Sequence, residues 1–167
     1  MFWDEASFGR ISDPTYCWCP CGIRPVVPRH RVREYVYAFG AVDPIGGDDY
    51  FMISPKCNTD WTSKFLELLS AEYSNDYILL CGDGAPWHKS GGLIIPDNIE
   101  LFFIPPYTPE MNPTEQIWKE VRKSGFKNTA FSTLDKVVDK LSDILGNVKN
   151  ELVKSVCGRE WIVSMFN

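Results

Sequence analysis

The segment from Glu34 to Val42, EYVYAFGAV, restricts the possible folds more than any other stretch of the sequence. It is apolar on both of its alternating faces, as in a central β-strand that is covered by protein on two sides. A turn at residues 46–49 (GGDD) and a second apolar run from Tyr50 to Ser54 predict a hairpin partner for this strand. The pattern therefore indicates a sheet with other elements packed on both of its faces.

The remaining patterns alternate between helix and strand. Short apolar strands are predicted over residues 77–81 (YILLC) and 99–104 (IELFFI), and one amphipathic helix is marked by Trp61, Phe65, Leu68 and Leu69. Further helices are expected after Asn112, after Ser132 and over residues 151–166, the last with a break near Gly158. The helix after Ser132 has one apolar stripe, formed by Leu134, Val137, Val138, Leu141, Ile144, Leu145 and Val148. This order predicts an α/β fold with an antiparallel edge and a parallel centre.

Length and composition fit a single domain spanning residues 1–167. No apolar run approaches the roughly 20 residues that span a membrane, and the first residues lack a signal-peptide pattern, so a cytoplasmic location is expected. The net charge of −5 argues against a protein whose whole surface grips DNA, because phosphate contacts supply most non-specific affinity. A nuclease domain remains compatible with this charge, since a carboxylate-lined site is acidic until metal ions fill it.

Residues 12–30 contain four prolines and are predicted to be irregular. Within them, Cys17, Cys19 and Cys21 form a C-x-C-x-C cluster, which differs from the paired C-x-x-C spacing of zinc sites. Reduced thiols are expected in a chain without an export signal. A structural metal held by these three thiols, with His30 as a fourth ligand, is the less favoured alternative.

Two aspartates stand where ligands collect in α/β sheets, at or near the carboxyl ends of strands. Asp83 directly follows the strand at 77–81 and lies between two glycines, which also makes it an ordinary turn residue. Asp4 is followed by Glu5, and on a strand these two side chains point to opposite faces, so that only one of them can face the same site as Asp83. The alternative is that both are solvated residues near a frayed terminus.

A third acid, Glu115, lies in the sequence Asn112-Pro113-Thr114-Glu115, just inside the next helix. Asn is a favoured N-cap and Pro a favoured first helical residue, and Glu three residues after the cap completes a capping box. Glu115 is also spaced i, i+4 from Lys119, which predicts a modest ion pair. Its local environment therefore explains Glu115 without any catalytic role.

The segment from Leu101 to Arg122, LFFIPPYTPEMNPTEQIWKEVR, resembles the signature of the DDE superfamily endonucleases, the bacterial insertion-sequence relatives of mariner transposases. In that family a strand leads to a P-x-Y-S/T-P-x-x-N-P-x-E turn, and the following helix carries the third acid and a tryptophan, here Glu115 and Trp118. LLCGDGAPWHKS matches the second motif, with its acid at Asp83 and a histidine at His88. DEASFGR matches the first motif, with its acid at Asp4, and WCPCGIRP resembles the segment that follows it.

The resemblance implies an RNase H-like fold, a mixed five-stranded sheet with flanking helices. It also implies that Asp4, Asp83 and Glu115 are catalytic and hold two Mg²⁺ or Mn²⁺ ions, with Asp4 shared by both, Asp83 on one and Glu115 on the other. Oxygen-only ligands suit these metals, and a pair of them can clamp an in-line phosphoryl displacement. The implied reaction is hydrolysis of DNA at the end of a mobile element, followed by joining of the 3′-hydroxyl to target DNA.

Several further residues are candidates for contacts with DNA or for ordering the site, namely His88, Asn112, Lys119, Arg122 and Lys123. For His88, a helix-surface or partly buried histidine is an equal alternative. A solvated basic face is the equal alternative for the three basic residues. Core packing is the better interpretation of Trp118.

Relatives of this kind carry helix-turn-helix domains before the catalytic domain, whereas this chain starts three residues before Asp4, with a first strand that looks clipped. A DNA-binding part encoded separately, or a decayed gene, would account for this. The resemblance also implies a homodimer acting on paired DNA ends. Two alternatives stay open, an inactive remnant that only binds DNA or partner chains, and another RNase H-like nuclease.

Overall fold

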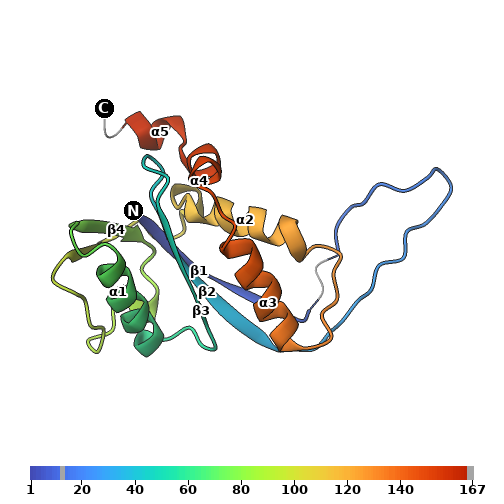
Figure 1. The fold of residues 1–167 in the computed structure, drawn as a ribbon, viewed down its shortest axis with the longest axis horizontal. Helices are drawn as coiled ribbons and strands as arrows, with labels where there is room; N and C mark the ends of the chain where they lie inside the picture. Colours follow the sequence, from blue (N-terminus) through green and yellow to red (C-terminus); the bar gives the residue numbers. More distant parts are fainter. Residues whose placement is uncertain (12–13, 165–167) are drawn as a thin grey trace.

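The computed structural model describes residues 1–11 and 14–164, and they contain one mixed five-stranded sheet (Figure 1). Its strands are β1 (Phe2–Gly9), β2 (Tyr35–Val42), β3 (Asp49–Ser54), β4 (Ile78–Gly82) and β5 (Ile99–Phe103), in the spatial order β3-β2-β1-β4-β5. β1, β2 and β3 pair antiparallel, whereas β1, β4 and β5 pair parallel. The predicted α/β fold with an antiparallel edge is therefore confirmed.

Helices cover both faces of the sheet, as the doubly apolar β2 requires (Figure 1). On one face, α1 (Thr59–Glu72) packs with a core built around Trp3, Phe39 and Phe65. The opposite face is covered by α2 (Thr114–Gly125), α3 (Leu134–Leu145) and α4 (Asn150–Cys157), whose core includes Phe8 and Trp118. The alternation of β1 and β2 side chains between these two cores fixes the register of the sheet centre.

The helix ends agree with the sequence patterns except in detail. The break at Gly158 is confirmed, since α4 stops at Cys157 and α5 (Glu160–Val163) begins after it. The predicted end of this segment at Phe166 lies outside the described residues. α3 is shorter than its apolar stripe, because it ends at Leu145 and Val148 packs on the core from the following turn. Among the described residues, no helix is long and apolar enough to cross a bilayer.

The first strand, which looks clipped before Asp4 in the sequence, extends well beyond Asp4 in the structure. β1 continues to Gly9 and pairs with β2 along its whole length, from Phe2 opposite Val42 to Gly9 opposite Tyr35. Burial on both faces accounts for this length, since Trp3 near one end of the strand enters one core and Phe8 near the other end enters the second core. Asp4 is therefore the third residue of an eight-residue strand and is held by pairing opposite Gly40.

Residues 14–34 form a long irregular segment between β1 and β2 that projects from the body of the molecule, whereas residues 12 and 13 of the predicted segment lie outside the described residues (Figure 1). Its three clustered thiols, on Cys17, Cys19 and Cys21, are exposed and free. His30 instead places Nδ1 2.9 Å from the carbonyl oxygen of Phe131. Within the described part of the chain, no three His, Cys, Asp or Glu side chains are arranged to hold a metal ion, so the geometry does not support a structural metal here.

Candidate metal centre

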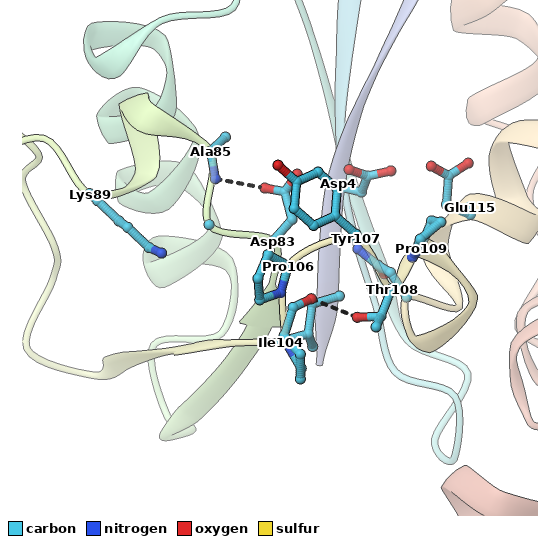
Figure 2. Close-up of a pocket in the computed structure, with 13 residues that line it drawn as sticks. Asp4, Asp83, Ala85, Lys89, Ile104, Pro106, Tyr107, Thr108, Pro109 and Glu115 are labelled. Atoms are coloured by element: carbon cyan, nitrogen blue, oxygen red, sulfur yellow. Dashed lines mark hydrogen bonds between the residues drawn. The ribbon is translucent and has the colours of Figure 1, made fainter.

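The three predicted acids come together in one pocket of about 390 Å³. Asp4 enters it from β1, Asp83 from the residue after β4, and Glu115 from the first turn of α2. Figure 2 shows their carboxylates side by side, with Asp4 between Asp83 and Glu115. Sheet topology accounts for this convergence, because β1 and β4 are parallel neighbours and α2 begins beside their carboxyl-side junction.

Asp83 is positioned by tight packing beneath it and by hydrogen bonds around it. A Cβ on the preceding Gly82 would lie 2.1 Å from Nε1 of Trp3, so only glycine fits where the chain leaves β4. The Asp83 carboxylate accepts a hydrogen bond from the backbone N–H of Ala85 at 3.1 Å, as an aspartate in a turn does. The Asp83 side chain remains 56% exposed and lines the pocket, so its role as a turn residue is compatible with a place in the site.

Glu115 has no structural partner, and the predicted capping box is wrong. The backbone N–H of Asn112 donates instead to the carbonyl of Pro109, in the 3₁₀ turn η2 (Pro109–Met111), and so is unavailable to a glutamate. Lys119 lies 3.5 Å from Gln116 rather than in an ion pair with Glu115. In the described part of the chain, no hydrogen bond or ion pair engages the Glu115 carboxylate, which is therefore free to bind a ligand.

Asp4 is held in place but is not neutralised. Nε1 of Trp118 donates a hydrogen bond to its Oδ2 at 3.1 Å, while the indole ring itself lies in the core as predicted. Burial, together with the nearby charges of Glu115, Glu5 and Asp83, raises the pKa of Asp4 to about 8. The interpretation of Asp4 as a solvated terminal residue is wrong, because the strand buries it beside other acids that repel its charge.

Glu5 forms a second, closed arrangement on the opposite face of β1, which sequence reasoning missed. Its Oε1 lies 2.7 Å from Nε2 of His88, and the Glu5 and His88 side chains are 7% and 1% exposed. Nδ1 of His88 lies 3.0 Å from both the carbonyl oxygen and Oδ1 of Asp83. Because both ring nitrogens face acceptors, the ring donates twice, as imidazolium does. Strand alternation predicted that Glu5 faces away from Asp4, but it did not indicate His88 as the partner.

The pKa values of His88 and Asp83 reflect this network. Burial alone would lower the pKa of His88, but its hydrogen bonds to Asp83 and Glu5 raise it to about 9. The hydrogen bond from His88 in turn holds the pKa of Asp83 below its ordinary value. His88 is thus a buried histidine and not one on a helix surface, and the Trp3 ring packs 4.2 Å from it between centroids.

The other candidate residues take different places. Asn112 lines the pocket and ties its loop to the sheet, since its Nδ2 donates to the carbonyl of Trp3 at 2.8 Å. Arg122 lies over the Phe8 ring and reaches the carbonyl of Ser7, away from the pocket. Lys119 and Lys123 are exposed on α2 but do not line the pocket. Lys89, which no motif singled out, does line it.

The donor set fits divalent cations even though no three side chains close around one point in the described residues. Mg²⁺ is commonly bound by one or two carboxylates together with water and substrate phosphate oxygens, so a pair of acids suffices for each ion. Asp4 stands between two such partners. Burial and the charges of the neighbouring acids raise its pKa, and a bound cation would favour the charged form of Asp4 and relieve this repulsion.

A mixed five-stranded sheet, flanking helices and three carboxylates meeting where parallel strands β1 and β4 join a helix define a class, the RNase H-like nucleases of DDE type. The chain belongs to the DDE superfamily endonuclease family, whose model matches residues 1–138. A relative from Sinorhizobium fredii, the protein y4pE/y4sA, is 34% identical over 105 residues, which are 62% of this chain and 78% of that protein.

Solved structures of the Mos1 transposase show the same fold. The Mos1 strand transfer complex aligns with a TM-score of 0.70 at 14% identity, over 94% of this chain and 50% of that one. The Mos1 catalytic domain with raltegravir and Mn aligns with a TM-score of 0.62 at 13% identity, over 94% of this chain and 74% of that one. The fold is RNase H-like, as in the Mos1 catalytic domain, and this chain spans about half the length of the Mos1 transposase in its DNA complexes.

Proposed function

We propose that this chain is the catalytic domain of an insertion-sequence transposase, which hydrolyses a DNA phosphodiester at the element's end and joins the freed 3′-hydroxyl to target DNA. The observation that carries the proposal is the pocket in which Asp4, Asp83 and Glu115 converge, with Glu115 unpaired and Asp4 uncompensated. Relatives of the same fold support it, since Mos1 has been solved in a paired-end complex with Mn and in another with Mg.

In this proposal, Asp4 is the shared metal ligand, Asp83 serves one ion and Glu115 the other, in accord with the central place of Asp4. Two bound Mg²⁺ or Mn²⁺ ions would activate the attacking water or 3′-hydroxyl and stabilise the leaving oxygen. The chain's own contribution is to fix the ligands. His88 orients the Asp83 carboxylate, Trp118 orients that of Asp4, and Asn112 holds the loop before α2 against β1.

We further propose that residues 1–167 act as one domain, that DNA is the partner, and that two copies work together on paired ends. Exposed Lys119 and Lys123 on α2 are available to the phosphate backbone, as is Lys89 at the pocket. Arg122 is engaged with Phe8 and Ser7 and is a weaker candidate. Recognition of the element's terminal repeats would fall to DNA-binding elements other than these residues.

The alternative of an inactive remnant drew support from a clipped first strand, and β1 is instead paired along eight residues. The test is supercoiled-plasmid nicking with Mn²⁺ or Mg²⁺, together with calorimetric titration of Mn²⁺. Wild-type protein should nick DNA and bind the ion, and Asp83→Asn and Glu115→Gln should do neither. Glu110→Gln is the matched control, because Glu110 is an exposed acid of η2 that does not line the pocket. A wild-type protein that binds no Mn²⁺ would overturn the proposal.

A further inference from the structure

Tyr107 has an unusual conformation at the rim of the metal pocket. Its φ of 62° lies in the left-handed region, and its side chain is 99% exposed. A non-glycine residue with positive φ is uncommon, and Asn, Asp and His are enriched among such residues. Asn128, with a φ of 56°, is of that ordinary kind, whereas Tyr107 is not.

Nothing within the described residues compensates for this conformation. A strained backbone of this kind costs about 1–3 kcal/mol, and full exposure of an aromatic ring forgoes the burial that a ring usually gains on folding. In that part of the chain, Tyr107 makes no aromatic contact and its hydroxyl forms no hydrogen bond. The surrounding fold holds this backbone conformation and leaves the ring uncovered at the rim of the pocket.

The loop around Tyr107 is built to keep the ring where it is. Pro105 and Pro106 precede it and Pro109 follows shortly after, and each fixes its own φ. Thr108 closes the loop, since its Oγ1 donates to the carbonyl oxygen of Pro105 at 2.6 Å. Tyr107 lines the same pocket as Asp4 and Asp83, together with Ile104 and Pro106, and in the view of Figure 2 its ring overlaps the two carboxylates. The ring is thus presented rigidly at the mouth of the pocket.

We propose that Tyr107 stacks on a nucleobase of the DNA strand whose phosphate enters the metal pocket. This rests on the proposed function, since only a nucleic-acid substrate brings a base to that rim. An exposed aromatic face is the usual platform for an unpaired base, and such stacking tolerates any base because every base has a π-face. The negative charges of the acids that line the same pocket exclude a role for the ring in binding free phosphate. Because the ring lies at the rim of this pocket, a base stacked on it would lie near the phosphate that reacts.

The experiment uses DNA with 2-aminopurine next to the cleavage position, bound in Ca²⁺ so that the strand stays intact. Wild-type protein should quench the probe's fluorescence by stacking. Tyr107→Ala should abolish the quenching and weaken binding by about tenfold, while Tyr107→Phe, which keeps the ring, should behave as wild type. Both variants retain the strained backbone, so they are comparable in folding. Tyr77→Ala is the matched control, because Tyr77 is also exposed but hydrogen-bonds to Glu100 and does not line the pocket.

Three results would overturn the stacking role. These are quenching that persists in Tyr107→Ala, loss in Tyr107→Phe as large as in Tyr107→Ala, or a Tyr107→Ala variant that changes only self-association in sedimentation, which would assign the ring to a second copy. If Tyr107→Ala still nicks plasmid and quenches normally, stacking alone fails. If wild-type protein neither binds the probe DNA nor nicks plasmid, the proposed function fails with it.

Discussion

Asp4 and Glu5 are neighbouring acids on the same strand, yet the pleat points their side chains to opposite faces of the sheet and into different surroundings. Asp4 faces the pocket and accepts a hydrogen bond from Trp118, and burial together with the neighbouring acids raises its pKa to about 8. Glu5 faces the other core and is closed by His88 at 2.7 Å. The comparison teaches that a buried carboxylate paired with a cation, such as Glu5, contributes to the structure. A buried carboxylate among like charges, such as Asp4, is instead suited to bind a cation from solution.

The sharpest way to break this contrast is to remove the charge of Asp4. We expect Asp4→Asn to lower plasmid nicking by at least about a thousandfold, because Asp4 is the proposed shared metal ligand and bound metal ions supply several kcal/mol to the transition state. The metal-free variant should unfold at the same temperature as wild type or higher, since a repelled charge is gone. Nicking rates and thermal melts in EDTA measure both. A variant that melts well below wild type would mean that Asp4 is structural.

Glu5→Gln tests the opposite side of the strand. The amide removes the charge that faces His88, and breaking a buried pair in this way costs about 3–5 kcal/mol. Loss of a residue that orients a metal ligand also weakens metal binding by about 10- to 100-fold. Glu5→Gln should therefore lower both the free energy of unfolding and the affinity for Mn²⁺. Asp4→Asn differs in that it should not lower the stability of the metal-free protein. Glu34→Gln is a control, since the ion pair of Glu34 with Arg10 is half-exposed. Equal stability of Glu5→Gln and wild type would contradict the assignment.

Trp118→Phe sharpens the comparison on the Asp4 side. The substitution keeps an aromatic ring against Phe8 and Phe51 but removes the N–H that binds Asp4. A hydrogen bond to a charged group contributes about 1.5–3 kcal/mol, so we expect nicking to fall by about tenfold or somewhat more. Dependence of the rate on Mn²⁺ concentration should move to higher concentrations, because the ligand is less fixed. Unchanged metal dependence would show that the indole only fills the core.

The smallest expected effect is a change of stability with pH in metal-free protein. The raised pKa of Asp4 means that its contribution to stability is full below pH 4 and is lost as pH rises to about 8. His88, with a pKa of about 9, loses its contribution between pH 6.5 and 9, and Asp49 acts like Asp4 up to about pH 6. The melting temperature in EDTA should thus fall by a few degrees from pH 5 to pH 8. Asp4→Asn or added Mn²⁺ should flatten this slope.

Sequence reasoning found the parts of this molecule that local patterns encode. β2 and its hairpin follow from apolar alternation, and Asp83 and Glu115 lie in short motifs next to strand and helix ends. It failed where the partner is distant. The contact between Glu5 and His88 joins residues 83 positions apart, and no local spacing reveals it.

Two further misses have physical reasons of their own. The predicted capping box does not form, although its sequence pattern is complete, because the N–H of Asn112 donates to the carbonyl of Pro109 in a 3₁₀ turn. The left-handed backbone of Tyr107 runs against its residue type, so residue type gave no indication of it. Both lie in the loop that carries the third acid, where the fold around the pocket, and not the local sequence, decides the geometry.

The short pairing between β1 and β4 has a consequence for the local stability of the site. These strands share one registered pair, Phe2 with Cys81, whereas β1 and β2 are paired along eight residues. Asp4 and Asp83 stand on opposite sides of this weak seam. A cation bound by both Asp4 and Asp83 would link β1 to β4, so release of the metal and local opening of this strand pair would be coupled. Hydrogen exchange at the Cys81 amide, which bonds to the carbonyl of Met1, would then slow on adding Mn²⁺ while exchange in β2 stays the same.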